Sequence, residues 1–207
     1  MRATGCMEPS RPEAVHGQRF VREEWYAREF GLETYESCVF IDCDFSESHS
    51  VGTVFEHCEF VGATFNSSVH ETSRFDNCLF RDSSLFDATF LNCKLTGTRF
   101  ANTALRPLRI EGGNWSFVNF FGADLRTVSF DGLNLEEADF GEARLDKASF
   151  RNTDLTRATL RAASVLGADF RGADLDGVQL GGLDWRKTRI DPRLAMQIAE
   201  SLGAIVE

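Results

Sequence analysis

The chain has 207 residues, and its 32 acidic and 22 basic side chains give a formal net charge of −10. This charge argues against direct binding to nucleic acid, because phosphates attract basic surfaces. The mean hydropathy is −0.23, and no apolar run approaches the roughly 18 residues that a membrane span needs. The N-terminus also lacks the apolar core of a secretory signal, so we expect a cytoplasmic protein.

Two segments precede the regular part of the chain. Residues 1–17 contain prolines, glycines and mixed charges with few apolar side chains, and we expect a disordered leader there. Residues 18–37 continue a five-residue spacing of aromatic side chains, from Phe20 to Tyr35, but polar residues stand two places before each of them. We expect an irregular N-terminal coil or cap at 18–37, and a capping helix is the alternative because some apolar residues there lie near helical spacing.

Residues 38–190 repeat one five-residue unit without insertion or loss. If the central residue of each unit is called i, every i is a multiple of five, from Phe40 to Ile190, and most are Phe or Leu. Position i−2 is usually Ala, Ser, Thr or Cys. Five of the six cysteines occupy it, so we interpret them as small buried fillers rather than metal ligands. They are Cys38, Cys43, Cys58, Cys78 and Cys93.

A period of five fits neither an α-helix nor a flat strand. Both i and i−2 can point inward if each unit is a short extended piece followed by a tight turn, so that each unit forms one side of a square. Four units then close one coil of 20 residues, and coils stack as parallel strands about 4.8 Å apart. Residues 20 apart in the sequence therefore lie directly above one another, and the filled interior leaves no room for a cofactor. A repeat architecture is the predicted fold class.

One stretch in the middle of this region departs from the repeat. Pro107 lacks the amide donor of a ladder position, Leu108 and Gly113 replace the usual small residue at i−2, and Trp115 stands at i. We predict a local bend of the rod at these four residues.

Stacking with a 20-residue period also allows the charges to be sorted by face. The units centred on 35, 55, 75 and every twentieth residue up to 175 carry nine acids against three bases, a net charge of −6, while the other three faces come to −2, 0 and −1. Eight of these acids form the predicted partner-binding acidic face: Glu36, Glu56, Asp76, Glu136, Glu137, Asp154, Asp174 and Asp176. A solvated face of an acidic protein is the alternative interpretation.

After Ile190 the pattern changes to that of a helix. Asp191 suits an N-cap, Pro192 the first turn and Gly203 a stop. The apolar residues between them lie at helical spacing, and we expect this segment, residues 191–207, to cover the open last coil. The predicted apolar patch consists of Leu194, Ala195, Ile198, Ala199, Leu202, Ile205 and Val206.

Units such as Ala123-Asp124-Leu125 and Ala168-Asp169-Phe170 resemble the A(D/N)LXX repeats of the pentapeptide-repeat proteins. This resemblance covers at least residues 38–190 and implies an all-β fold, a right-handed quadrilateral parallel β-helix, with a short C-terminal α-helix. The sequence Arg106-Pro107-Leu108 and the end of the chain, 194–206, are similar to the topoisomerase-binding members, the mycobacterial MfpA-type and the Qnr-type fluoroquinolone-resistance proteins.

The resemblance also implies a function. Members of that group are dimers joined through the C-terminal region, so we expect a homodimer with the apolar patch of residues 191–207 as its interface. Members also bind DNA gyrase or topoisomerase IV by imitating DNA. We therefore expect a DNA mimic that competes with DNA and contributes to resistance to quinolones or natural topoisomerase poisons. A non-catalytic scaffolding module for another protein is the alternative. The unbroken register leaves no room for the loops of Qnr-type proteins. No catalytic constellation, metal site or phosphate-binding loop is evident in the sequence, so we do not expect an enzyme.

Overall fold

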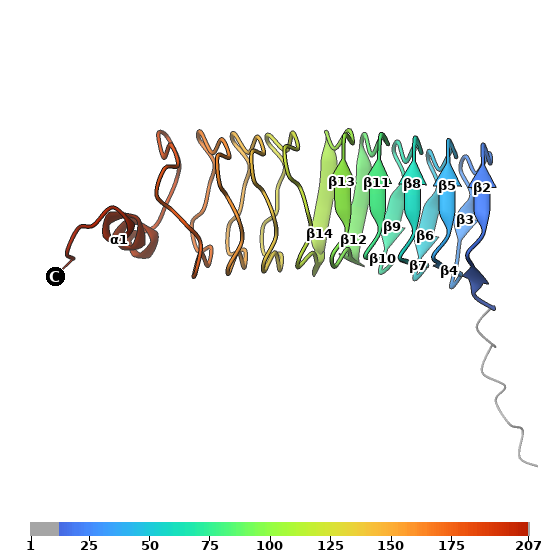
Figure 1. Cartoon of the computed structure of the whole chain (residues 1–207), viewed down its shortest axis with the longest axis horizontal. Coiled ribbons are helices and arrows are strands. Elements are labelled where there is room, and N and C mark those ends of the chain that lie inside the picture. Colours follow the sequence, from blue (N-terminus) through green and yellow to red (C-terminus); the bar gives the residue numbers. More distant parts are fainter. Residues whose placement is uncertain (1–12, 207) are drawn as a thin grey trace, which may run out of the picture.

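The computed structural model describes residues 13–206, which form one elongated rod of stacked coils with a helix at its C-terminal end (Figure 1). The first 12 residues of the predicted leader lie outside the described part of the chain. Residues Val15–His16 belong to the rod, because they form strand β1 and pair with β4, Thr34–Glu36. The predicted leader boundary at residue 17 is therefore too late.

Short parallel strands build the N-terminal half of the rod. The remaining strands are β2 (Arg19–Val21), β3 (Glu29–Phe30), β5 (Val39–Ile41), β6 (His49–Val51), β7 (Val54–Glu56), β8 (Glu59–Val61), β9 (Val69–Glu71), β10 (Arg74–Asp76), β11 (Leu79–Arg81), β12 (Ala88–Lys94), β13 (Arg99–Ala101) and β14 (Leu108–Asn114). One sheet has the order β1-β4-β7-β10-β12-β9-β6-β3, with β14 also paired to β12, and the other has the order β13-β11-β8-β5-β2.

Every strand pair joins residues 20 apart, as the sequence predicts. Phe40 pairs with Phe60, and Phe55 with Phe75. Beyond β14 the same stacking continues through isolated parallel bridges, such as Asn119 with Asp139. The fold is a quadrilateral parallel β-helix, and the predicted fold class is confirmed.

The chain turns each corner at position i+2. The residue there adopts a left-handed conformation in nearly every unit, for example Asp42 (φ 51°), Asn77 (φ 53°) and Gly122 (φ 68°). Glycine adopts this conformation without a steric penalty, and Asn and Asp tolerate it better than other side chains do. Position i+2 is therefore a third structural position of the repeat, in addition to i and i−2.

The interior is filled by columns of aromatic rings. Rings from successive coils stack, as Phe45 does on Phe65 with centroids 4.4 Å apart, and rings within one coil meet edge to face, as Phe55 does with Phe60 at 5.4 Å. The five cysteines at i−2 are buried, and the thiol of Cys58 donates to the carbonyl oxygen of Tyr35 in the preceding coil. This placement supports their interpretation as fillers.

A small polar network interrupts this apolar interior. The buried imidazole of His70 contacts Ser50 Oγ through Nδ1, at 2.7 Å, and Ser68 Oγ through Nε2, at 3.0 Å. Its ring stacks on Phe90. Burial lowers the pKa of His70 to about 3, so the side chain is neutral near pH 7 and its two nitrogens have hydrogen-bond partners.

Residues 18–37 are more regular than the sequence suggests. Strands β2, β3 and β4 lie in this segment and pair in the same 20-residue register with β5, β6 and β7, and the alternative of a helix is wrong. Polar residues are tolerated at i−2 here because this is the open end of the rod. Gln18 and Glu23 are exposed, and Arg28 lies over the rings of Trp25 and Phe30.

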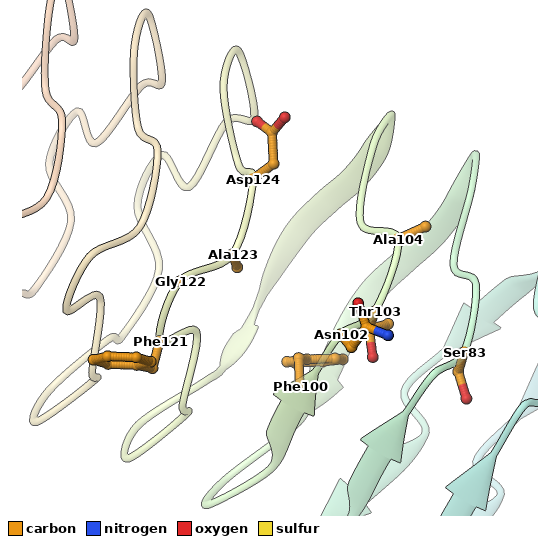
Figure 2. Close-up of a pocket in the computed structure, with 9 residues that line it drawn as sticks. All are labelled: Ser83, Phe100, Asn102, Thr103, Ala104, Phe121, Gly122, Ala123 and Asp124. Atoms are coloured by element: carbon orange, nitrogen blue, oxygen red, sulfur yellow. The ribbon is translucent and has the colours of Figure 1, made fainter.

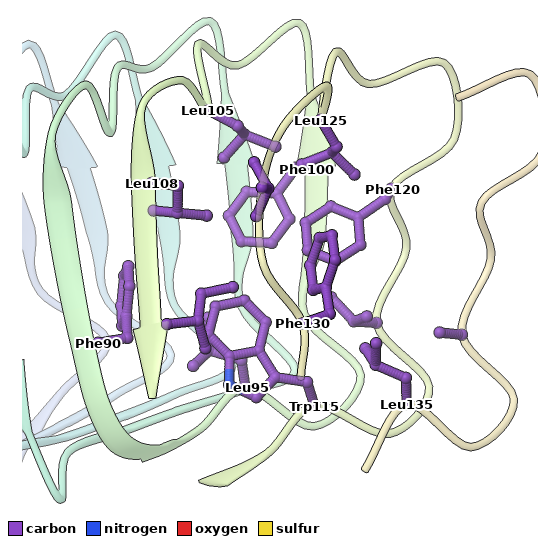
Figure 3. Packing of buried hydrophobic residues seen from close by; sticks show 14 of the residues in the cluster. Phe90, Leu95, Phe100, Leu105, Leu108, Trp115, Phe120, Leu125, Phe130 and Leu135 are labelled. Carbon is purple, nitrogen blue, oxygen red and sulfur yellow. The ribbon is translucent and has the colours of Figure 1, made fainter. Parts of the chain in front are cut away.

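The stretch around Pro107 has an altered corner. Pro107 occupies position i+2, but its ring fixes φ near −65°, so the left-handed corner found in other units cannot form. The strands next to it are longer, since β12 and β14 have seven residues each and pair with one another. Gly113 has a φ of 100°, and a Cβ atom there would overlap the carbonyl oxygen of Cys93. Leu108 and Trp115 point into the core (Figure 3).

The ladder of backbone hydrogen bonds between successive coils is interrupted beside this altered corner. On two adjacent faces, among the described residues, no backbone hydrogen bond joins Leu105 to Asp124 or Ile110 to Ser129. The other two faces remain closed, through Phe100 N to Asn119 O at 3.1 Å and Trp115 N to Asn134 O at 2.9 Å. We call the gap between residues 102–112 and 121–131 the mid-rod opening. It is consistent with the predicted bend, which stays a prediction.

The C-terminal segment forms helix α1, Pro192–Ser201. The carboxylate of Asp191 accepts from the backbone amide of Leu194 at 3.0 Å, which makes it the N-cap. Gly203 has a φ of 88°, as expected just after the end of a helix. Leu194 is buried, and Ile198 packs against the core of the rod, so this helix covers part of the last coil.

Candidate partner-binding surfaces

The three N-terminal residues of the acidic face form one column. The pairing register places Glu36 beside Glu56 and Glu56 beside Asp76, on adjacent strands β4, β7 and β10. Their side chains differ in exposure, at 44%, 40% and 10% respectively. Two of the three carboxylates are thus available at the surface, whereas Asp76 is largely covered.

Basic side chains accompany this column. His16 Nδ1 lies 2.9 Å from a carboxylate oxygen of Glu36, in the position that precedes Glu36 in the same column. Arg74 Nε donates to Asp76 Oδ2 at 2.7 Å. The other oxygen of Asp76 is buried and has no hydrogen-bond partner within residues 13–206. His57 Nδ1 lies 4.0 Å from a carboxylate oxygen of Glu56. Asp76 is therefore paired and covered, whereas Glu36 and Glu56 are exposed and each has a histidine nearby.

The C-terminal part of the acidic face contains the other five residues. Arg157 pairs with both Glu136 and Glu137, and Arg193 donates to Asp174 at 3.0 Å. Asp154 accepts from the amide of Thr156 at 2.9 Å, and Asp176 is exposed. Neither Asp154 nor Asp176 has an ion-pair partner in the described part of the chain. These two residues are therefore the least neutralised positions of the face.

The opposite side of the rod has a different charge distribution. From residue 104 onward, the units centred on 105, 125, 145, 165 and 185 carry six bases against three acids, although the whole face is neutral. Arg106 and Arg126 both contact Asp124 there, and Arg126, then Arg106, holds the pKa of Asp124 well below its usual range. In its C-terminal half the rod is therefore acidic on one side and basic on the other.

The predicted apolar patch of the C-terminal segment is divided by the structure. Leu194 and Ile198 face the rod, whereas Leu202 is 73% exposed and Ile205 is 88% exposed. Met196, which the predicted patch omits, is also exposed. Ala195 and Val206 are exposed and Ala199 is half-buried. The outer part of this patch is the part available to another molecule.

Within residues 13–206 no three His, Cys, Asp or Glu side chains converge as a metal site requires. The helix that the structure contains is too short and too polar to cross a membrane. Cavities of about 360 and 510 Å³ lie along the mid-rod opening, and one of about 290 Å³ lies on the acidic face beside Glu56 and Asp76.

Comparison with known proteins agrees with this architecture. Residues 75–140 match the model of a pentapeptide repeat region, and residues 153–184 match the model of eight pentapeptide repeats. The pentapeptide repeat protein MfpA of Mycobacterium tuberculosis is 32% identical over 87 residues, which are 42% of this chain and 48% of MfpA. The match thus spans about half the length of that relative.

Solved structures share the fold over nearly the whole chain. Two trypsin-treated forms of QnrB1, a plasmid-mediated fluoroquinolone resistance protein, superpose with TM-scores of 0.63 and 0.59 at 22% and 23% sequence identity. Each match covers 94% of this chain, and 98% and 97% of the respective QnrB1 chains. Together, the repeat, the coil register and these matches identify the chain as a pentapeptide-repeat protein, related in sequence to MfpA and in fold to QnrB1.

Proposed function

We propose that this protein binds a type II topoisomerase, DNA gyrase or topoisomerase IV, and competes there with DNA. The observation that carries the proposal is the acidic face, in which Glu36, Glu56 and Asp76 follow the rod axis in the strict register of its coils. Such a row of negative charge imitates a phosphate backbone and suits the basic groove in which a topoisomerase holds DNA. The relationship to MfpA, and the description of QnrB1 as a resistance protein, favour this partner class. Binding would contribute to resistance to quinolones or natural topoisomerase poisons.

A supercoiling assay with purified gyrase tests the proposal. The wild-type protein should inhibit supercoiling at micromolar concentrations, and inhibition should weaken as salt rises, because surface charges are screened. The double variant Glu36→Lys/Glu56→Lys should inhibit at least about tenfold less, since each reversal replaces an attraction with a repulsion. Glu24→Lys/Glu47→Lys makes the same charge change in the same coils on another face, and it should behave as the wild type. Equal loss in both variants would mean that net charge, not the acidic face, drives binding.

We further propose that two chains associate through the outer part of the C-terminal patch. Leu202 and Ile205 are large, exposed apolar side chains three residues apart in the sequence, and their burial in a dimer would be favourable. Light scattering of the wild type should give twice the monomer mass. Leu202→Arg should give a monomer, while Leu166→Arg, at an exposed leucine on the rod, should remain a dimer. A monomeric wild type contradicts this proposal without affecting topoisomerase binding.

Scaffolding for another protein is the second candidate, and one observation favours it. Half of the eight acids on the face are paired with an arginine within residues 13–206, namely Asp76, Glu136, Glu137 and Asp174. A rod whose charges serve mainly to stabilise its own coils would inhibit neither topoisomerase. Absence of inhibition and of drug protection in both enzyme assays would favour this candidate.

A further inference from the structure

Three guanidinium groups converge on one carboxylate at the edge of the mid-rod opening. Arg106 Nη1 lies 3.0 Å from both oxygens of Asp124, Arg126 donates to them through Nε at 2.8 Å and Nη2 at 2.6 Å, and Arg144 Nη1 lies 3.8 Å away. The nearby carboxylate of Asp146 interacts with Ser164 Oγ and the amide of Leu166. This Asp124 cluster, Arg106, Arg126, Arg144 and Asp124, therefore retains excess positive charge in a chain whose net charge is −10.

A cavity of about 360 Å³ adjoins the cluster. Its lining includes Asn102, Thr103 and Ala104 from one coil and Phe121 and Asp124 from the next. Figure 2 shows Asp124 at the outer edge, on the coil across from Ala104. The cavity exists because these two coils are not joined on this face.

The same opening leaves backbone donors without partners. In the preceding coil Leu85 N donates to Ala104 O at 2.8 Å, and Ser84 N to Ala63 O at 3.0 Å. The equivalent amides of Leu105 and Asp124 make no backbone hydrogen bond among the described residues. In the ladder geometry both N–H groups point along the rod axis into the gap. Buried or half-buried amides of this kind need an acceptor.

We propose that the Asp124 cluster and these amides bind a phosphate-class oxyanion. Guanidinium groups match the geometry of phosphate oxygens with paired donors, and backbone N–H groups in a concave site add directional donors without an ordering cost. Asp124 engages one donor of Arg106 and two of Arg126, so both guanidiniums keep donors for a second anion. This site lies on the side of the rod opposite the acidic face, and it does not depend on topoisomerase binding.

A second cluster of similar construction provides an internal control. The carboxylate of Asp169 accepts from Arg171 at 2.9 and 2.6 Å, and Arg189 lies 3.9 Å away in the next coil. The ladder is closed there, through Asp169 N to Ala148 O at 3.0 Å and Phe170 N to Arg189 O at 2.8 Å. This cluster thus has converging guanidiniums but neither an opening nor free amides, and it should bind the anion weakly.

Calorimetric titration of the full-length protein with pyrophosphate, at constant ionic strength, tests the site. We expect one site per chain, and Arg126→Gln should weaken binding at least about tenfold, the loss typical of a charged hydrogen bond. Arg171→Gln should leave the affinity unchanged. Asp124→Asn should tighten binding several-fold, because it removes the carboxylate that competes for the guanidiniums. Arg106→Gln serves as a second test if Arg126→Gln does not keep the far-UV circular dichroism of the wild type.

A further titration, with ADP, identifies the source of the oxyanion. If ADP binds more tightly than pyrophosphate, the ligand is a nucleoside phosphate. If ADP and pyrophosphate bind equally, the site takes a free oxyanion. No binding of either probe, or equal weakening in Arg126→Gln and Arg171→Gln, would overturn the proposal.

Discussion

Acid should destabilise this rod through His70. The imidazole is buried, is enclosed by Phe65, Phe75 and Phe90, and contacts two serine hydroxyls. Desolvation first, and the charge of His49 second, lower its pKa from 6.5 to about 3. The folded state therefore binds this proton much more weakly than the unfolded chain does. Stability should fall as the pH drops from 6.5 towards 3.

The size of this effect follows from proton linkage. One pKa unit corresponds to about 1.4 kcal/mol, so between pH 7 and pH 4.5 His70 should remove about 2.5 kcal/mol of unfolding free energy. Buried carboxylates with lowered pKa values, such as Asp169, also lose stability in acid. The contribution of His70 must therefore be measured as a difference between two proteins.

His70→Phe is the variant that isolates the contribution of His70 to the loss of stability in acid. Phenylalanine restores the residue most common at position i, and its ring can stack on Phe90 as the imidazole does. The two serines keep partners, because Ser68 donates to Phe65 O at 2.8 Å and Ser50 lies 3.0 Å from Ser73 Oγ. We expect the variant to be within about 2 kcal/mol of the wild type at pH 7.

Urea denaturation at pH 7 and pH 4.5, followed by circular dichroism, provides the measurement. The wild type should lose about 2.5 kcal/mol more than His70→Phe over this interval. Serine hydroxyls do not titrate in this range, so no other group in the network can mimic the difference. An equal acid loss in both proteins would show that His70 takes up a proton in the folded state, and the reasoning from burial would be refuted.

Three other predictions concern the core and the end of the rod. Gly113→Ala should lower the free energy of unfolding by more than about 3 kcal/mol, because its Cβ would overlap backbone atoms. Gly122 also has a positive φ but open space around it, so Gly122→Ala should lower the free energy of unfolding by only about 1 kcal/mol. Urea midpoints compare the two variants. In a Cys6→Ser background no thiol should react with Ellman's reagent in the native state and five should react in urea, since the repeat cysteines are buried and burial raises the pKa of Cys93 to about 12. Leu202→Arg should abolish the dimer in light scattering, and its thermal midpoint should equal that of the wild type diluted until it is monomeric, because Leu202 is mostly exposed. A midpoint below that value would mean that Leu202 packs on the rod.

The sequence predicts most of the fold because the repeat determines its own geometry. A constant period of five places Phe40 on Phe60 and Glu36 beside Glu56 without any knowledge of the strands. The cap at Asp191 is equally predictable, since the N-cap side chain and Pro192 are local signals. The long-range strand register, normally the hardest property to predict, follows here directly from the residue numbers, because paired residues are always 20 apart.

The chemistry of the surface was less predictable, for two reasons. Counting residues by face gives formal charges but not ion pairs, and the partners of the acids come from elsewhere in the chain. His16, which pairs with Glu36, lies in the segment expected to be a disordered leader. Asp76 is covered because Arg74, on the same strand and the same face, folds back over it. A carboxylate can thus stand in the predicted column and still be unavailable to a partner.

The mid-rod opening could have been predicted from one signal in the sequence, a proline at position i+2. Position i+2 must be left-handed, and Gly, Asn and Asp occur there repeatedly, so a proline at that position is incompatible with an ordinary corner. Pro107 is that exception, and Leu108, next in sequence, enlarges the side chain at i−2 in the following unit. One corner is consequently rebuilt, two faces lose their ladder, and the donors released there lie beside Arg106 and Asp124. The same departure from the repeat that suggests a bend therefore also creates the one place along the described rod where cavity, free amides and clustered guanidiniums coincide.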